Sequence, residues 1–197
     1  MMYTGNKKID SFLELEIKEC IFHGIKVDLA NVKTLHHGNF GTFDEDTLRV
    51  AIKNPVRKWL PVFVHESCHK DQFLERDESW NTHIKGVDAT AIMNAWLARL
   101  CELNETQLKA VTAKVQRVEI DCEKRAVKKI KKYNLPIDLD KYIKEANAYL
   151  WYYHGVAKSR KWGCGNFLHP KILQMMPTHF RNNYDKPPKN YLELLLP

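Results

Sequence analysis

One apolar stripe through the middle of the sequence constrains the fold more than any other feature. Between residues 104 and 134, apolar side chains recur every three or four positions, which is the period of an α-helix: Leu108, Val111, Val115, Val118, Cys122, Ala126, Ile130 and Tyr133. Asn104 and Gln107 have the spacing of a capping box at its start, and Pro136 follows its end. We therefore expect one long helix that packs its apolar face against a core.

The first quarter of the chain has strand-like patterns instead. Residues 25–29 alternate between apolar and polar side chains, and residues 47–52 form a strand-like run that Asn54 and Pro55 close. Residues 31–46 carry glycines and polar side chains, which is typical of a loop. We predict a mainly helical α+β protein with one domain over residues 1–197. Its parts are a small N-terminal sheet over about 21–55, a helical core over about 60–155 and an irregular tail over 156–197.

The pattern HExxH occurs as His65, Glu66 and His69, in a segment that predicts a helix from about Pro61 to Leu74. Residues four apart share a helix face, so the two imidazoles can bind the same ion. Glu66 lies beside them and can act as general base and then as general acid. The pattern predicts a zinc ion (Zn2+), with His65 and His69 as ligands and Glu66 as the catalytic residue. A buried helix whose histidines bond to protein groups is the alternative interpretation.

On these residues the chain resembles the zincin metallopeptidases, in which the same motif supplies two zinc ligands and the general base. Metzincins continue the motif with a glycine and a third histidine, where this chain has Gln72 and Glu75. The gluzincin branch instead takes its third ligand from a glutamate on a later helix, often followed four residues on by an acid that hydrogen-bonds a ligand histidine. The resemblance implies a zincin-like fold of the compact, gluzincin-like kind that occurs in bacteria and phages.

The long helix offers three acids for the third position, and their angles around the helix axis separate them. At 100° per residue, Glu119 lies about 45° from the centre of the apolar stripe, Glu123 about 85° and Asp121 about 115°. A lone carboxylate inside the buried face suffers a desolvation penalty that a cation relieves. We therefore predict Glu119 as the third metal ligand. Glu123 is predicted to orient a ligand histidine by accepting a hydrogen bond from its imidazole N–H. Alternatives are a buried ion pair or partial exposure of Glu119, and weaker candidates for the ligand are Glu75, His83 and His154.

Two further features bear on catalysis. Zincins often stabilise the oxyanion with a tyrosine or histidine beyond the third ligand, which makes Tyr153 and His154 candidates here. The spacing of Tyr149 and Tyr153 is equally typical of packing residues. The strand over 47–52 precedes the motif helix, and in zincins an edge strand at this place pairs with an extended substrate.

Charge and cysteine usage bear on location and partners. The chain has 31 Lys and Arg against 24 Asp and Glu, a net charge of +7, which is compatible with an acidic partner. Its five cysteines are widely spread and form no CxxC pair, which favours a reducing compartment. No apolar run is long enough for a membrane span, and the N-terminus is charged where a signal peptide is apolar. We therefore expect a cytoplasmic protein.

The sequence as a whole predicts a zinc-dependent intracellular peptidase, a hydrolase that cleaves a peptide bond with a metal-activated water. The alternative is a catalytically silent zincin-like module that contacts nucleic acid or a protein partner through the basic residues 124–132. A solvated helix face is the simpler interpretation of that run, because no aromatic residues are interleaved as in single-strand binders. A zinc deaminase needs a cysteine pair that this chain lacks. The connection over 70–104 is long enough to cover a cleft.

Overall fold

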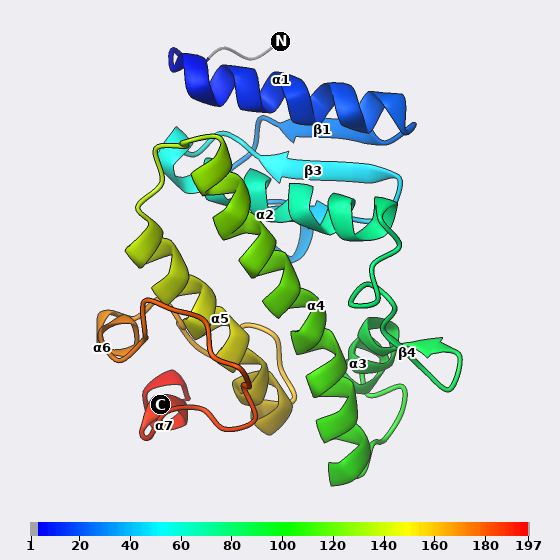
Figure 1. Cartoon of the computed structure of the whole chain (residues 1–197). Helices are drawn as coiled ribbons and strands as arrows, with labels where there is room; N and C mark the ends of the chain where they lie inside the picture. The colour runs from blue at the N-terminus through cyan, green and yellow to red at the C-terminus, as the bar shows by residue number, and fades with distance from the viewer. Residues whose placement is uncertain (1–3, 197) are drawn as a thin grey trace. The chain divides into compact units, whose positions relative to one another are not determined.

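The chain is organised in two compact units, which are described in turn (Figure 1). The computed structural model describes residues 4–196, without the side chain of residue 37. Unit 1 comprises Met1–Asp77 and Cys122–Leu139, and unit 2 comprises Glu78–Asp121 and Asp140–Pro197. The predicted α+β, mainly helical class is confirmed. The prediction of a single domain over residues 1–197 stays a prediction.

Unit 1 contains a three-stranded sheet with the strand order β1-β3-β2. β1 (Lys26–Ala30) runs parallel to β3 (Thr47–Ala51), and β2 (Gly41–Phe43) runs antiparallel to it. The strand predicted over 47–52 exists, but it is the central strand, so the expectation that it forms the edge was wrong. The edge on that side is β2, which lies in the segment predicted as loop. Three residues that begin with a glycine give too little alternation to be recognised as a strand.

One face of this sheet is buried and the other is polar. Leu48 and Val50 of β3 are fully buried. Across the pair, Phe43 and Gly41 stand opposite them and therefore share that face. On the other face, Arg49 pairs with Asp28 of β1 at 2.8 Å. The alternation thus decides which face the helices cover.

Helices α1 (Lys7–Phe22) and α2 (Val56–Leu74) supply that cover. α2 contacts β2 and β3, and α1 contacts β1. Phe12 of α1 meets Phe63 of α2 edge to face, with ring centroids 6.0 Å apart. α2 begins at Val56, before the start predicted at Pro61. Pro61 lies in the second turn of α2, where it removes the intrahelical hydrogen bond that an N–H at this position would donate.

A closed ring of buried and half-buried charges, called the buried ring below, joins α1, α2 and the C-terminal part of α4 (Glu105–Lys132). Glu16 gives one carboxylate oxygen to Lys70 at 2.9 Å and the other to Lys129 at 2.7 Å. Asp71 does the same, at 2.9 Å from Lys70 and 2.8 Å from Lys129. Lys70 also contacts Glu19 and has no exposed surface.

Protonation of both lysines is stabilised within this ring. Burial by itself lowers the pKa of Lys70, but Glu16 and Asp71 outweigh it and raise the pKa above its ordinary value. The pKa of Lys129 is raised for the same reason, against the same opposing effect of burial. The ring therefore stays charged at neutral pH, and removal of one lysine leaves both carboxylates to share the single remaining cation.

Unit 2 is built from helices and one short hairpin. Its elements are β4 (His83–Ile84), β5 (Val87–Asp88), α3 (Ala89–Leu97), the N-terminal part of α4, α5 (Leu139–Ser159), whose first residue still belongs to unit 1, α6 (Pro170–Gln174) and α7 (Tyr191–Leu195). The predicted capping box is confirmed, because the backbone N–H of Gln107 donates to Asn104 Oδ1 and that of Asn104 donates to Gln107 Oε1, both at 2.9 Å. Asp88 caps α3 through the N–H of Ala91 at 2.8 Å.

The C-terminal tail is less irregular than predicted, since α6 and α7 lie in it. α7 packs on α5 at Gly155, where a Cβ would lie 2.3 Å from Leu195 Cδ2. Gly155 therefore serves close packing within α5, which continues past it to Ser159. Among the residues described, no helix is both long and apolar enough to cross a membrane.

The buried ring predicts a clear difference in stability between two neighbouring lysines. Lys129→Met leaves Glu16 and Asp71 with too little positive charge, so we expect the free energy of unfolding to fall by about 3 kcal/mol. Lys128→Met, at an exposed position on the same helix, should change it by no more than about 0.5 kcal/mol. Urea unfolding followed by circular dichroism measures both, and equal effects of the two substitutions would contradict the assignment.

Candidate metal centre

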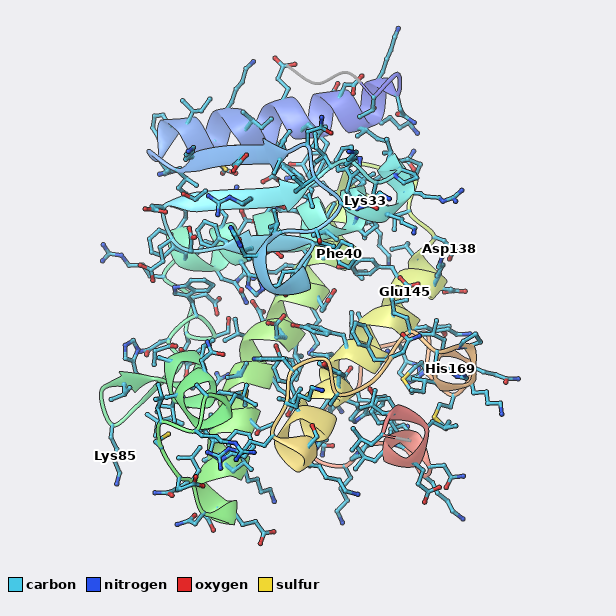
Figure 2. The ribbon with its side chains drawn as sticks, turned by 180° about the vertical axis from the view of Figure 1, so that it is seen from behind. Lys33, Phe40, Lys85, Asp138, Glu145 and His169 are labelled. Atoms are coloured by element: carbon cyan, nitrogen blue, oxygen red, sulfur yellow. The ribbon has the colours of Figure 1, made fainter. Side chains whose placement is uncertain are left out.

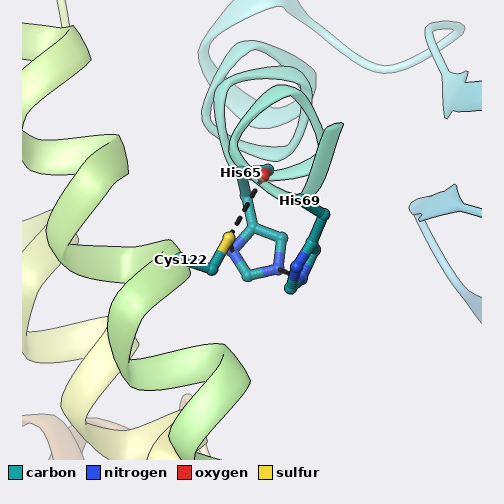
Figure 3. Close-up of side chains that lie close together, drawn as sticks. All are labelled: His65, His69 and Cys122. Atoms are coloured by element: carbon teal, nitrogen blue, oxygen red, sulfur yellow. Dashed lines mark hydrogen bonds between the residues drawn. The ribbon is translucent and has the colours of Figure 1, made fainter. Parts of the chain in front are cut away.

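The two motif histidines face each other on α2 in unit 1. Their rings meet edge to face, with centroids 4.7 Å apart and an interplanar angle of 85°. The Nε2 atom of His65 lies 3.1 Å from the Nε2 atom of His69 (Figure 3). This is the arrangement that the four-residue spacing predicts for two imidazoles directed at one point.

The other nitrogen of each ring has an oxygen partner. His65 Nδ1 lies 3.1 Å from Glu123 Oε1, and His69 Nδ1 lies 2.8 Å from Gln72 Oε1. An ionised carboxylate and an amide oxygen only accept hydrogen bonds, so each imidazole donates from Nδ1. In the neutral rings the proton is then on Nδ1, and both Nε2 atoms present lone pairs to each other.

These residues fit a zinc ion. Two lone pairs 3.1 Å apart repel each other, and a cation beside them or a proton on one of the two nitrogens removes the repulsion. A tetrahedral zinc with nitrogen ligands at about 2.0 to 2.1 Å holds two such nitrogens about 3.3 to 3.4 Å apart, close to the separation found. Ligand histidines commonly donate their second N–H to a carboxylate or an amide oxygen, as both do here.

Glu123 contacts His65, its role beside a ligand histidine stays a prediction, and burial on this helix differs from the burial expected from the angles. The Glu123 side chain is buried, at 5% exposure, whereas Glu119 is only half-buried. An angle measured from the centre of the apolar stripe predicts burial only if neighbouring elements cover the helix equally on both sides of that centre. Here the His65 ring covers one flank of α4 in unit 1, which buries Glu123 although it lies far from the stripe's centre.

Cys122 is a neighbour of the centre that the sequence analysis did not single out. Its thiol donates to the backbone carbonyl of His65 at 3.2 Å and lies 3.6 Å from His65 Nδ1. It belongs with His65 and His69 to a group whose possible ligand atoms all lie within 4.8 Å of one another. The thiol thus lies beside the nitrogen that Glu123 also contacts. Within the apolar stripe a cysteine gives no signal that distinguishes it from a packing residue.

Glu66 lies against the edge of the sheet. Its side chain is 8% exposed. A Cβ at Gly41 of β2 would lie 2.8 Å from Glu66 Oε1, which shows how closely the carboxylate approaches this strand. The side chain of Glu66 therefore lies in the contact between its own helix, α2, and strand β2.

Three other predicted residues, Glu119, Tyr153 and His154, belong to unit 2. Tyr153 donates a hydrogen bond to Glu119 Oε1 at 3.1 Å, and its hydroxyl lies 2.9 Å from that of Tyr149. Burial raises the pKa of Tyr153 well above its ordinary value, and Glu119 adds to the effect, so the phenol remains a donor at neutral pH. His154 Nε2 donates to the carbonyl of Tyr184 at 2.6 Å. Because the histidine pair belongs to unit 1, the roles of these three residues at the metal stay predictions.

The two remaining candidates for the third ligand have other partners. Glu75 is exposed and pairs with Arg125 at 2.6 Å within unit 1. His83 is exposed in unit 2, with its Nδ1 3.0 Å from Asn81 Oδ1. Neither contact points to metal binding.

Comparison with known proteins assigns no family to the chain. Searches against protein-family models, curated proteins and solved structures gave no match. Function is therefore inferred from the geometry and chemistry of these residues.

Metal content of variants tests which acid completes the centre. We expect the purified chain to bind one equivalent of zinc and to lose it in His65→Ala, His69→Ala and Glu119→Ala. Glu123→Ala should keep a site weakened by about 10- to 100-fold, because it removes only the partner of His65 Nδ1. Asp121→Ala is the matched control on the same helix and should bind normally. Elemental analysis and zinc titration give the result, and loss in Glu123→Ala with retention in Glu119→Ala would reassign the ligand.

Proposed function

We propose that the chain is a zinc-dependent peptidase of the zincin type, with His65 and His69 as metal ligands and Glu66 as proton carrier. The observation that carries the proposal is the pair of Nε2 atoms 3.1 Å apart, each on a ring whose Nδ1 is held by an oxygen acceptor. We propose Glu119 as the third ligand, because the gluzincins, which the chain resembles, take that ligand from a glutamate on a later helix. A mainly helical α+β protein with a small sheet beside the motif helix agrees with the proposed zincin-like fold.

The parts of the centre would divide the work of hydrolysis. When bound, zinc supplies a Lewis acid that polarises a peptide carbonyl and lowers the pKa of water. Glu123 and Gln72 keep the two imidazoles in the tautomer that leaves Nε2 available. Glu66 accepts a proton from the attacking water at a carboxylate oxygen and returns it to the leaving amine.

The free edge of β2 favours an extended polypeptide as substrate. The N–H of Ala51 donates to the carbonyl of Phe40 at 2.8 Å, and the N–H of Asp44 donates to the carbonyl of Thr47 at 3.2 Å. Residues 40 and 44 therefore face β3, and alternation along an antiparallel strand turns the backbone groups of Gly41 away from β3. An added peptide strand can pair with those groups. Phe40, labelled in Figure 2, stands at the start of this edge and is 50% exposed.

The rival function, a binding module that uses the basic run 124–132, has less support. Arg125 pairs with Glu75 at 2.6 Å and with Asp77 at 2.7 Å. Lys129 belongs to the buried ring with Glu16 and Asp71. Two cations of the run thus neutralise acids of unit 1, which lowers the positive charge offered to a polyanion.

Substitution of Glu66 separates the peptidase from the binding module. Glu66→Gln keeps the size of the side chain but cannot accept a proton as a carboxylate does, so cleavage should fall by at least about 100-fold while zinc content is unchanged. Cleavage of a random octapeptide library, followed by mass spectrometry, measures the first quantity and elemental analysis the second. Glu75→Gln, at an exposed glutamate of the same unit, is the matched control and should behave as the wild type. Cleavage at the wild-type rate in Glu66→Gln would contradict the proposal.

A further inference from the structure

We propose that Gly41 is the positioning residue for Glu66: its missing side chain lets the carboxylate approach β2, the edge strand of the sheet. The inference rests on the proposed peptidase function and adds a residue outside the HExxH motif to it. Gly41 itself takes no part in the chemistry. It acts through Glu66, by setting where that carboxylate stands relative to a paired substrate strand.

Space, and not backbone conformation, explains the glycine at position 41. Five of the eight glycines have a positive φ and nothing within 4 Å of an added Cβ: Gly5, Gly24, Gly38, Gly86 and Gly163. Gly41 is not among them, and its strand backbone is one that other residues adopt. A glycine inside a strand weakens it, and close approach of a neighbour is the usual physical reason for one.

The neighbours of Gly41 come from the motif helix. An added Cβ would lie 2.5 Å from Val62 Cγ1, 2.8 Å from Glu66 Cγ and 2.8 Å from Glu66 Oε1. The other two glycines with close neighbours, Gly155 and Gly165, both meet Leu195 of α7. Among the glycines, Gly41 alone has the motif carboxylate as a close neighbour.

The same residue also carries free backbone groups. The register with β3 turns the N–H and carbonyl of Gly41 to the open edge, as shown above from the bonds of Phe40 and Asp44. The carboxylate of Glu66 therefore approaches β2 at a residue with which an added peptide strand pairs. A methyl group at position 41 has to displace either the strand or Glu66, and misplacement by about 1 Å can lower a rate by about 100-fold.

The first test is the kinetics of Gly41→Ala, with the best-cleaved octapeptide of the random library as substrate. We expect zinc content and KM close to the wild-type values and kcat lower by about 100-fold. Thr42→Ala, the next residue of β2 with its side chain on the opposite face, is the matched control and should keep its kcat. Gly41→Ala with the kcat of the wild type overturns the inference.

A second variant guards against simple loss of folding. Val62→Ala in the Gly41→Ala background removes the 2.5 Å contact and leaves the contacts with Glu66, so stability should recover in part while kcat stays low. Recovery of kcat together with stability overturns the inference, because the glycine would then serve only packing.

The contact itself can be tested without any activity. In urea unfolding, Gly41→Ala should lower the midpoint in the wild-type background and lower it clearly less when Glu66→Ala is already present. An equal drop in both backgrounds overturns the inference. Failure of the proposed function looks different, since the wild-type chain would then cleave no peptide of the library.

Discussion

Two imidazole nitrogens that face each other at 3.1 Å are the constraint on which the rest of the site depends. If Glu123 and Gln72 both accept hydrogen bonds, two neutral rings have no proton left for each other, and a cation is a suitable partner for both lone pairs. The competing arrangement is a direct N–H···N bond between the rings. It requires either that the Gln72 amide turns its NH2 group to His69 or that one ring carries a proton on both nitrogens.

The buried ring of Lys70, Glu16, Lys129 and Asp71 explains how this geometry can be held. Lys129 lies seven residues after Cys122 on α4, and Lys70 follows His69 directly on α2, so both lysines start from helices that carry the site. Buried ion pairs contribute little net stability, but they penalise any other packing of the helices that carry them. The ring thus favours the packing of α2 against the C-terminal part of α4 in which the carboxylate of Glu123 contacts His65 Nδ1.

Local signals in the sequence predicted much of the fold. The capping box of Asn104 and Gln107 and the period of the apolar stripe each depend on neighbours along the chain, and both were right. The motif helix and the central strand were predicted on the same basis. The edge strand β2 was missed because its pairing with β3 is a tertiary property.

The features of the site that were not predicted from the sequence depend on contacts between residues far apart in the chain. The burial of Glu123 depends on a histidine far away in the chain, which no angle on its own helix contains. Cys122 looks like any other apolar position until its thiol is seen against His65. Gly41 becomes informative only when the motif helix is packed on β2, because nothing near it in sequence requires a glycine.

X-ray absorption at the zinc edge of the purified, zinc-loaded chain tests the central claim most directly. The account predicts nitrogen and oxygen scatterers only in the first shell, with the outer-shell pattern of two imidazole rings. A spectrum without imidazole scattering would contradict it, and so would a sulfur at the distance of a thiolate ligand, which would make Cys122 part of a different centre.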